Sequence, residues 1–329
     1  MTAAPSDPLS LIEGIRAGDR RALARAITLA ESTRDDHRAD ADIILDAMLP
    51  ATGHAVRLGI SGPPGVGKST FIEAFGNHII ATGSRVAVLA VDPSSRRTGG
   101  SILGDKTRME ELSRRPEAFI RPSPGRGQLG GVARRTREAM LLCEAFGFDA
   151  VIVETIGVGQ SEVAVADMVD LFMLLVAPGG GDELQGIKRG IMELADLVVV
   201  NKADGDLAPA AGRTRADYNA AVHLLRPKWR SWETEVMAVS ALTGVGVAEV
   251  WDAIERFTAQ VGQSGELDAA RARQATAWLW SESGDTLLDR FRADPTVIGL
   301  LSDMESRVSS GQITPTMAAT RLLDAFAGH

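Results

Sequence analysis

Residues 62–70 of the chain combine closely spaced glycines with a lysine and two hydroxyl side chains. They are Gly62, Pro63, Pro64, Gly65, Val66, Gly67, Lys68, Ser69 and Thr70. Glycines at this spacing let consecutive backbone N–H groups converge on phosphate oxygens, and a helix that starts behind them adds its positive end. Lys68 is then placed to reach the β- and γ-phosphates, and the Ser69 hydroxyl to ligate Mg²⁺. Because every fixed position is present and both flanks fit, the segment predicts a nucleotide-binding loop rather than an incidental glycine-rich turn.

Two later segments have the groups that a guanine base requires. They are Asn201, Lys202 and Asp204, and then Ser240, Ala241 and Leu242. The Asp204 carboxylate can accept hydrogen bonds from N1–H and the 2-amino group of guanine, whereas adenine offers neither donor. Lys202 can lay its methylene stem along the base, and backbone N–H groups of 240–242 can reach the guanine O6. These segments predict GTP or GDP as the nucleotide.

Acidic residues follow two of the β-rich runs, at the strand ends where open α/β sheets bind ligands. Glu154 ends the run DAVIVET, Asp92 ends RVAVLAVD, and Asp105 lies in the glycine-rich segment after Asp92. We expect Asp92 to serve the Mg²⁺ site and Asp105 to orient the hydrolytic water. We expect Glu154 to act through a water near the metal or the γ-phosphate, and the sequence leaves open which acid ligates Mg²⁺ directly. The predicted catalytic residues are therefore Lys68, Asp105 and Glu154, and the predicted metal-site residues are Ser69, Asp92, Asp105 and Glu154.

A second glycine-rich stretch directly follows Glu154 and contains Gly157, Gly159 and Gln160. GTPases of the Ras type carry Asp-x-x-Gly where this chain has Glu-Thr-Ile-Gly. The stretch therefore predicts a switch that moves when the γ-phosphate leaves. Asp92 ends the run RVAVLAVD, where Ras-like enzymes have a threonine. This acid indicates the class that includes signal-recognition-particle and metallochaperone GTPases.

The hydrophobic pattern predicts the elements that position these residues. Apolar residues recur at helical spacing over 9–49, whereas 55–260 alternates short β-rich runs with helical stretches. This alternation predicts an α/β fold of the P-loop NTPase type, with a mostly parallel sheet flanked by helices. We expect an N-terminal helical segment over 1–52, a GTPase domain over 53–261 and a C-terminal helical arm over 262–329.

The C-terminal arm differs in composition from the rest of the chain. The segment VGQSGELD resembles a linker, and the tail after it is predicted to be helical with breaks near Pro295, Gly311 and Pro315. Apolar residues recur at helical spacing in this tail: Trp278, Leu279, Leu287, Leu288 and Phe291. A helical appendage of about sixty residues has too little core to stand alone. We therefore expect it to pack on a second copy in a symmetric homodimer, with packing back on its own nucleotide domain as the alternative.

Composition narrows the class of protein. The chain has 329 residues and a formal net charge of −8, which argues against nucleic acid or an anionic membrane as the main partner. The single cysteine, Cys143, excludes an internal disulfide and a cysteine metal cluster, and favours a reducing cytoplasm. Residues 1–20 carry acids and arginines where a signal peptide needs an apolar run, and no stretch reaches membrane-spanning length. We expect a cytoplasmic protein.

Five segments together resemble the MeaB/ArgK family, the G-protein chaperones of methylmalonyl-CoA mutase. They are SGPPGVGKST, AVDPSSRRTGGSILGDKTRM, VIVETIGVGQSE, PGGGDELQGIKRGIMELADLVVVNKAD and SAL. The resemblance covers essentially the whole chain and implies a homodimeric GTPase that binds the adenosylcobalamin-dependent mutase, gates cofactor loading and protects or reactivates that enzyme. The cobalamin belongs to the partner enzyme. The resemblance also implies a mobile loop over Gly179–Lys188, in which Asp182 and Lys188 couple to the partner.

Three other functions fit parts of the pattern. A metallochaperone-type GTPase for another metalloenzyme would need a His- or Cys-rich cluster, and the five histidines are scattered. A kinase for a transport-binding protein, an older label attached to the ArgK name, is disfavoured by the guanine selectivity and the lack of an acceptor-substrate site. A non-catalytic GTP-binding module is disfavoured by the intact Lys68, Ser69 and strand-end acids.

Four arginines lie in the segment GRGQLGGVARRTREAM: Arg126, Arg134, Arg135 and Arg137. One of them could act as an arginine finger for a dimer mate. A run of this kind is more often a solvated helix face.

Overall fold

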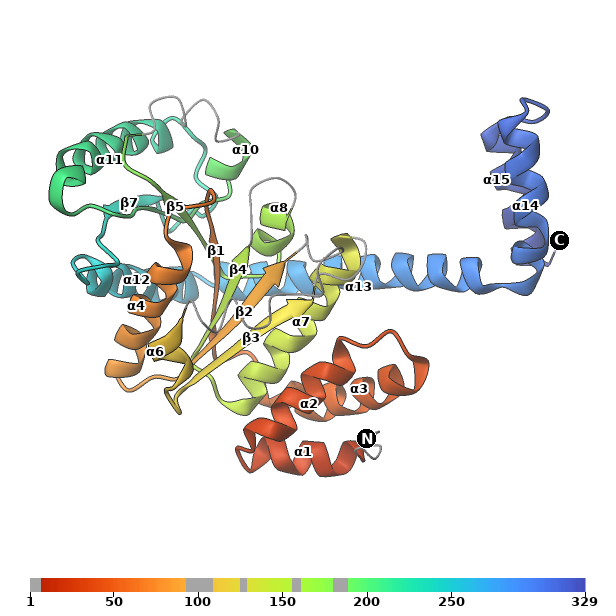
Figure 1. The fold of residues 1–329 in the computed structure, drawn as a ribbon, viewed down its shortest axis with the longest axis horizontal. Coiled ribbons are helices and arrows are strands. Elements are labelled where there is room, and N and C mark those ends of the chain that lie inside the picture. The colour runs from red at the N-terminus through yellow and green to blue at the C-terminus, as the bar shows by residue number, and fades with distance from the viewer. Residues whose placement is uncertain (1–6, 93–108, 125–128, 156–160, 180–188, 329) are drawn as a thin grey trace. The chain divides into compact units, whose positions relative to one another are not determined.

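A computed structural model describes residues 7–92, 109–124, 129–155, 161–179 and 189–328 (Figure 1). The chain forms two compact units, Met1–Gln274 and Ala275–His329. The predicted boundaries at residues 52 and 261 remain predictions. No helix in the described part of the chain combines the length and apolar character that crossing a membrane requires.

The first unit contains a seven-stranded parallel sheet in the order β3-β2-β4-β1-β5-β6-β7. The strands are β1 Val56–Ser61, β2 Val86–Asp92, β3 Ala118–Pro124, β4 Ala150–Thr155, β5 Leu171–Val176, β6 Leu197–Val200 and β7 Glu235–Ala238. Every side chain of β4 and β5 is buried, as their continuous apolar runs predict for inner strands. The predicted α/β fold with a parallel sheet is confirmed.

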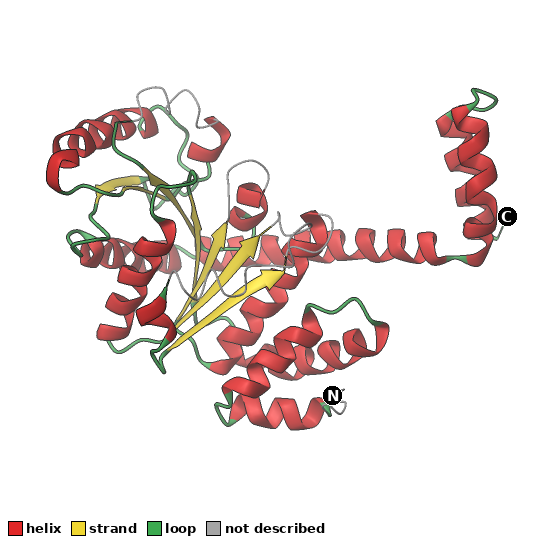
Figure 2. Cartoon of the chain, viewed as in Figure 1, coloured by secondary structure: helices red, strands yellow, loops and turns green. Residues whose placement is uncertain are grey.

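Helices cover both faces of this sheet (Figure 2). One face packs on α4 Lys68–Ala81, α6 Glu110–Ser113 and α12 Val247–Gln263. The opposite face packs on α7 Leu129–Phe146, α8 Ser161–Ala166, α10 Arg189–Met192 and α11 Ala208–Val222. Strand residues alternate between the two cores: Ile152 of β4 belongs to the α4 side, and Val151 and Val153 to the α7 side. Because side chains alternate in this way, the position of a residue in its strand shows whether it faces α4 or α7.

The predicted N-terminal helical segment forms three helices that pack on α7: α1 Pro8–Arg16, α2 Arg20–Ala30 and α3 Asp35–Met48. Asp7 and Asp19 start α1 and α2 by accepting hydrogen bonds from backbone N–H groups of the first turn. Arg38 of α3 donates two 2.8 Å hydrogen bonds to the Glu138 carboxylate of α7. Because Glu138 is almost fully buried, this pair holds the segment against the α/β fold of the first unit.

Three helices follow α12: α13 Glu266–Ala293, α14 Pro295–Ser309 and α15 Pro315–Ala327. The stretch predicted as a linker is almost wholly helical, since only Ser264 and Gly265 separate α12 from α13. The second unit holds the end of α13 with α14 and α15, around a small core of Val297, Met304, Ala318 and Leu322. Pro295 and Pro315, predicted as breaks, each take the first position of a helix, where the missing N–H costs nothing.

Candidate functional site

The predicted phosphate loop connects the end of β1 to the start of α4. Gly67 precedes α4 with a φ of +92°, and a Cβ at this position would lie 2.8 Å from Nδ2 of Asn201. Both the backbone conformation and the close approach therefore require glycine. The loop and the amino end of α4 lie at the carboxyl edge of the sheet, where doubly wound folds bind ligands.

Asn201 connects the phosphate loop with both predicted base-binding segments. Its Nδ2 donates to the Val66 carbonyl at 3.0 Å, and its Oδ1 accepts from the Ala241 N–H at 3.1 Å. Lys202 has a φ of +60°, and its Nζ donates to the Gly65 carbonyl at 2.7 Å. These bonds bring together three segments that lie far apart in the sequence.

The remaining base-binding residues lie beside Asn201. Asp204 is partly exposed and precedes a short 3₁₀ helix over Gly205–Leu207, which leaves its carboxylate reachable by a base. Ser240 is buried, and its Oγ accepts from the Thr243 N–H at 3.1 Å, which shapes the loop. Leu242 is exposed. The structure brings these residues together, and their contacts with a nucleotide stay predictions.

Lys68 is half buried at the first position of α4. Its Nζ donates to the carbonyls of Gly62 at 2.7 Å and Pro63 at 3.2 Å. Burial lowers the pKa of the Lys68 ammonium, and the charges of Glu154 and Glu162 offset part of that effect. The ammonium therefore contacts the phosphate loop, and the charges of two carboxylates act on it.

Glu154 lies near the end of β4, opposite Ile60 of β1 and Ala90 of β2, and only 5% of its side chain is exposed. The next residue, Thr155, donates a 2.8 Å hydrogen bond from Oγ1 to Oγ of Ser61, which joins the ends of β4 and β1. Glu162, in the first turn of α8, is 1% exposed and was not among the predicted site residues. The sequence signal that could have identified Glu162 is its place in the motif VGQSE, directly after the predicted switch.

The side-chain oxygen atoms at the carboxyl edge of the sheet suit Mg²⁺, which prefers hard oxygen ligands. Ser69 is partly buried in the first turn of α4, close to the phosphate loop, and Glu154 supplies a buried carboxylate. Asp92 is the last residue of β2, at the same edge of the sheet. Within the described ranges, no cluster of three or more His, Cys, Asp or Glu side chains could hold a metal ion.

Several predicted residues lie outside the described part of the chain. They are Asp105, Gly157, Gly159, Gln160, Asp182, Lys188 and Arg126. Of the other arginines, Arg134 forms a 3.4 Å ion pair with Glu138 on its own helix, and Arg135 and Arg137 are partly buried on α7. The arginine finger stays a prediction.

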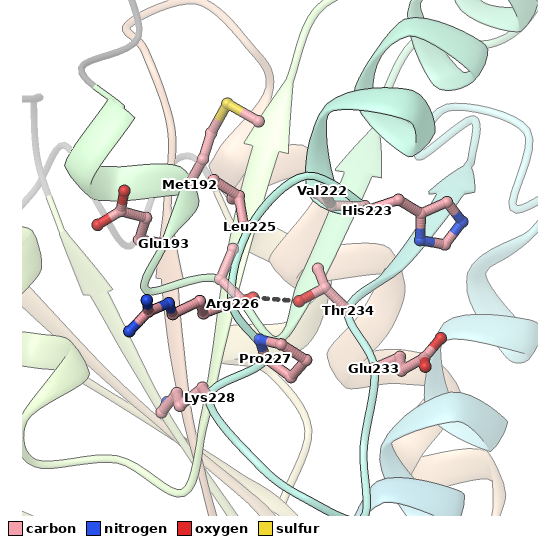
Figure 3. Close-up of a pocket in the computed structure, with 11 residues that line it drawn as sticks. Met192, Glu193, Val222, His223, Leu225, Arg226, Pro227, Lys228, Glu233 and Thr234 are labelled. Atoms are coloured by element: carbon pink, nitrogen blue, oxygen red, sulfur yellow. Dashed lines mark hydrogen bonds between the residues drawn. The ribbon is translucent and has the colours of Figure 1, made fainter.

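A separate cavity of about 160 Å³ lies at the opposite, amino edge of the sheet. Its walls come from the segments that lead into β6 and β7 (Figure 3). The Thr234 hydroxyl donates to the Ala195 carbonyl at 2.9 Å. One wall is fixed by buried Asp196, which accepts from Lys228 at 2.9 Å and from Nε1 of Trp229 at 2.7 Å. The cavity is not part of the nucleotide site.

Comparison with known proteins gives consistent matches. The family model described as methylmalonyl-CoA mutase-associated GTPase MeaB matches residues 23–296. The mouse (Mus musculus) mitochondrial homolog of methylmalonic aciduria type A is 50% identical over 326 residues, covering 96% of this chain and 79% of that protein. GTPase ArgK of Escherichia coli K12 is 51% identical over 283 residues, or 86% of each chain. A crystal structure titled LAO/AO transport system kinase is 39% identical with a TM-score of 0.76, and covers 99% of this chain and all of that one.

Proposed function

The chain belongs to the MeaB family of methylmalonyl-CoA mutase-associated GTPases, and from this membership we propose that it is a nucleotide-dependent chaperone of adenosylcobalamin-dependent methylmalonyl-CoA mutase. The chain is a GTPase, which converts GTP and water to GDP and phosphate. The observation that supports a guanine nucleotide most directly is the connection that Asn201 makes between the phosphate loop and Ala241. The metallochaperone alternative is not favoured, because the family match names mutase association.

We propose the following roles for the residues of the site. Asp204 and the backbone of 240–242 select guanine, and the loop over 62–67 holds the phosphates with its N–H groups. Lys68 leaves the carbonyls of Gly62 and Pro63 and binds the β- and γ-phosphates, where its charge stabilises the negative charge of the transition state. This rearrangement exchanges two neutral acceptors for anionic ones, so it is favourable when a triphosphate arrives.

Mg²⁺, held by Ser69 and the strand-end acids, would neutralise phosphate charge when bound. Glu154 orients the attacking water, directly or through a second water. Its burial supports this role, because a buried carboxylate near the carboxyl end of an inner strand keeps a fixed position. This end of the strand faces the nucleotide side, from which water can reach the carboxylate. Asp105 shares the orientation of the hydrolytic water, and Asp92 serves the metal site.

The partner assignment rests on family membership. The mouse relative and the one from Caenorhabditis elegans are both named methylmalonic aciduria type A homologs, at 50% and 45% identity. We propose that the mutase recognises the nucleotide state of this protein in the cytoplasm, and that residues 156–160 and 179–188 carry the signal through Gly157, Gln160, Asp182 and Lys188. Cobalamin stays with the mutase, whose cofactor loading this protein gates.

The test is a thermodynamic cycle measured by calorimetry. Mutase affinity should differ between the GDP form and the form with a non-hydrolysable GTP analogue, by roughly fivefold or more. By linkage, the mutase must then change the ratio of the two nucleotide affinities by the same factor. Deleting residues 180–185 should weaken this coupling and leave GTP bound, because the phosphate loop and base segments lie elsewhere. Equal mutase affinity in both states, with no effect of mutase on the GTPase rate, would refute the chaperone proposal.

A further inference from the structure

Glu162 is a buried acid beside the phosphate loop to which no role in GTP binding or hydrolysis has yet been given. Buried carboxylates are costly unless cations or hydrogen-bond donors surround them, so a buried acid at a phosphate site needs a physical reason. Glu154 has such a reason, because it is predicted to act at the γ-phosphate. Glu162 is even less exposed and comes from a different element.

The packing of α8 fixes where the Glu162 side chain lies. Glu162, Val165 and Ala166 are all buried and share one face of the helix, at the spacing i, i+3, i+4. This face packs directly on β1: a Cβ at Gly59 would lie 2.9 Å from Cγ1 of Val165. Glycine at position 59 therefore lets α8 approach β1 as closely as the backbone permits. Glu162 continues the same face one turn closer to the carboxyl edge, where β1 enters the phosphate loop.

The two acids come from elements that serve opposite faces of the sheet. Glu154 has the same parity in β4 as Ile152, whose side chain belongs to the core on the α4 face. Glu162 comes from α8, which packs on the α7 face. Burial lowers the pKa of the Lys68 ammonium, and the charges of Glu154 and Glu162 oppose that effect. In this structure the ammonium contacts the carbonyls of Gly62 and Pro63, and Glu162 lies at the end of the buried α8 face that is nearest the start of this loop.

We propose that Glu162 is a positioning residue that competes with the γ-phosphate of GTP for the Lys68 ammonium. A triphosphate brings more negative charge to Lys68 than a diphosphate does, so the repulsion of Glu162 is larger with GTP than with GDP. Tight binding of GTP then requires the first turn of α8 to move away from the phosphate loop. Because α8 directly follows the predicted switch over 156–160, this movement connects the nucleotide state to the surface beyond the active site.

The test compares nucleotide affinities of the full-length protein. Glu162→Gln keeps the shape of the side chain and removes its charge. We expect the affinity for a non-hydrolysable GTP analogue, relative to that for GDP, to rise about tenfold at fixed Mg²⁺ and salt, because one buried negative charge that acts on Lys68 is removed. Glu162→Asp keeps the charge and should leave this ratio within about twofold of the parent value. Glu162→Met, of similar volume, provides a second uncharged variant if the glutamine variant does not fold.

Glu138→Gln is the matched control. It also removes a buried carboxylate, but that carboxylate lies on α7 and pairs with Arg38 of α3 and Arg134 of α7. We expect it to lower thermal stability and to leave the affinity ratio of the two nucleotides unchanged. If the loss of any buried charge changed nucleotide binding, the affinity ratio would shift equally in the Glu138 and Glu162 variants. An unchanged ratio in folded Glu162→Gln or Glu162→Met protein would overturn the proposal, whether or not the mutase responds to nucleotide.

Discussion

At the scale of single residues, the amide of Asn201 connects two parts of the nucleotide site. It donates to the phosphate loop and accepts from the 240–242 segment. Both bonds are buried, so loss of either partner would leave an unsatisfied polar group. The side chain thereby fixes the phosphate loop against the 240–242 segment. We expect Asp204, three residues later, to select the base.

The base assignment predicts a change of nucleotide preference. Asp204→Asn should weaken GTP binding by on the order of a hundredfold, because two charge-assisted hydrogen bonds to guanine are lost. It should improve binding of xanthosine triphosphate, whose C2 oxygen accepts from the new amide. A competition titration with the two nucleotides measures both effects. Asp206→Asn, two residues away on the exposed 3₁₀ turn, is the control and should change neither. Unchanged preference in the Asp204 variant would exclude this residue as the guanine reader.

The assignment of Glu154 predicts a kinetic defect rather than a binding defect. Glu154→Gln should slow single-turnover GTP hydrolysis by roughly ten- to a thousandfold, while GDP affinity changes little. The reason is that the carboxylate acts on the attacking water, which the GDP complex lacks. Asp105→Asn should behave in the same way. Hydrolysis at the parent rate in both variants would show that neither acid acts in the chemical step.

Sequence reasoning predicted the site motifs because each depends on neighbouring residues. The phosphate loop, the segment around Asn201 and the strand ending in Glu154 all have local patterns, and the alternation of strands and helices predicted the sheet. Glu162 was missed because an acid in the first turn of a helix is ordinary by itself. Its burial against β1 depends on tertiary packing that no local pattern encodes.

At the scale of elements, the sequence could not predict the long-range contacts that attach the start of α13 to the first unit. Arg271 donates to both oxygens of Asp170, at 2.8 and 2.6 Å, and to the Ala55 carbonyl at 2.8 Å. One turn earlier, Glu266 accepts from the Ser231 hydroxyl at 2.6 Å and from the Arg230 N–H at 2.9 Å. These partners lie 35 to 216 residues away in the chain. The stretch that resembled a linker is therefore a firmly attached helix start.

The Arg271 contacts predict a large loss of stability when they are removed. Arg271→Ala should lower the free energy of unfolding of the first unit by about 3–5 kcal/mol, because Asp170 is almost fully buried and would keep its charge without this partner. Arg256→Ala removes an arginine from the neighbouring helix α12, where the pair with Glu235 is exposed. This control should change stability by only about 0.5 kcal/mol. Denaturant unfolding measures both, and equal effects would show that the Arg271 contacts add nothing beyond a surface pair.

At the scale of the whole molecule, the second unit leaves more large apolar side chains exposed than its small core buries. Its core consists of four buried residues with partly buried neighbours. Large apolar side chains remain exposed along its three helices: Leu279, Trp280, Leu287, Leu288, Ile298, Leu300, Leu301, Met317 and Leu323. An apolar surface of this kind on a small helical unit is typical of an interface. We propose, as the sequence predicted, that this surface packs on a second copy of the chain.

The dimer proposal predicts that removing the second unit yields a monomer. The truncation belongs after Gln274, because this point keeps Arg271 and the 2.8 Å hydrogen bond from Gln274 to the Val169 carbonyl, which hold the start of α13. Light scattering should give twice the 34.8 kDa chain mass for the full protein and a single-chain mass for the truncated one.

Full-length Trp280→Glu protein provides a second variant without truncation. Its side chain is 73% exposed, so the substitution should not disturb the fold of one chain and should weaken the dimer by placing a charge in the apolar interface. Arg321→Glu, on α15, changes a charge without touching an apolar side chain and should leave the dimer intact. A truncated chain that stays dimeric would place the interface elsewhere. A full-length chain that is monomeric would favour packing of the arm on its own nucleotide domain, because the exposed apolar surface would then need an intramolecular partner.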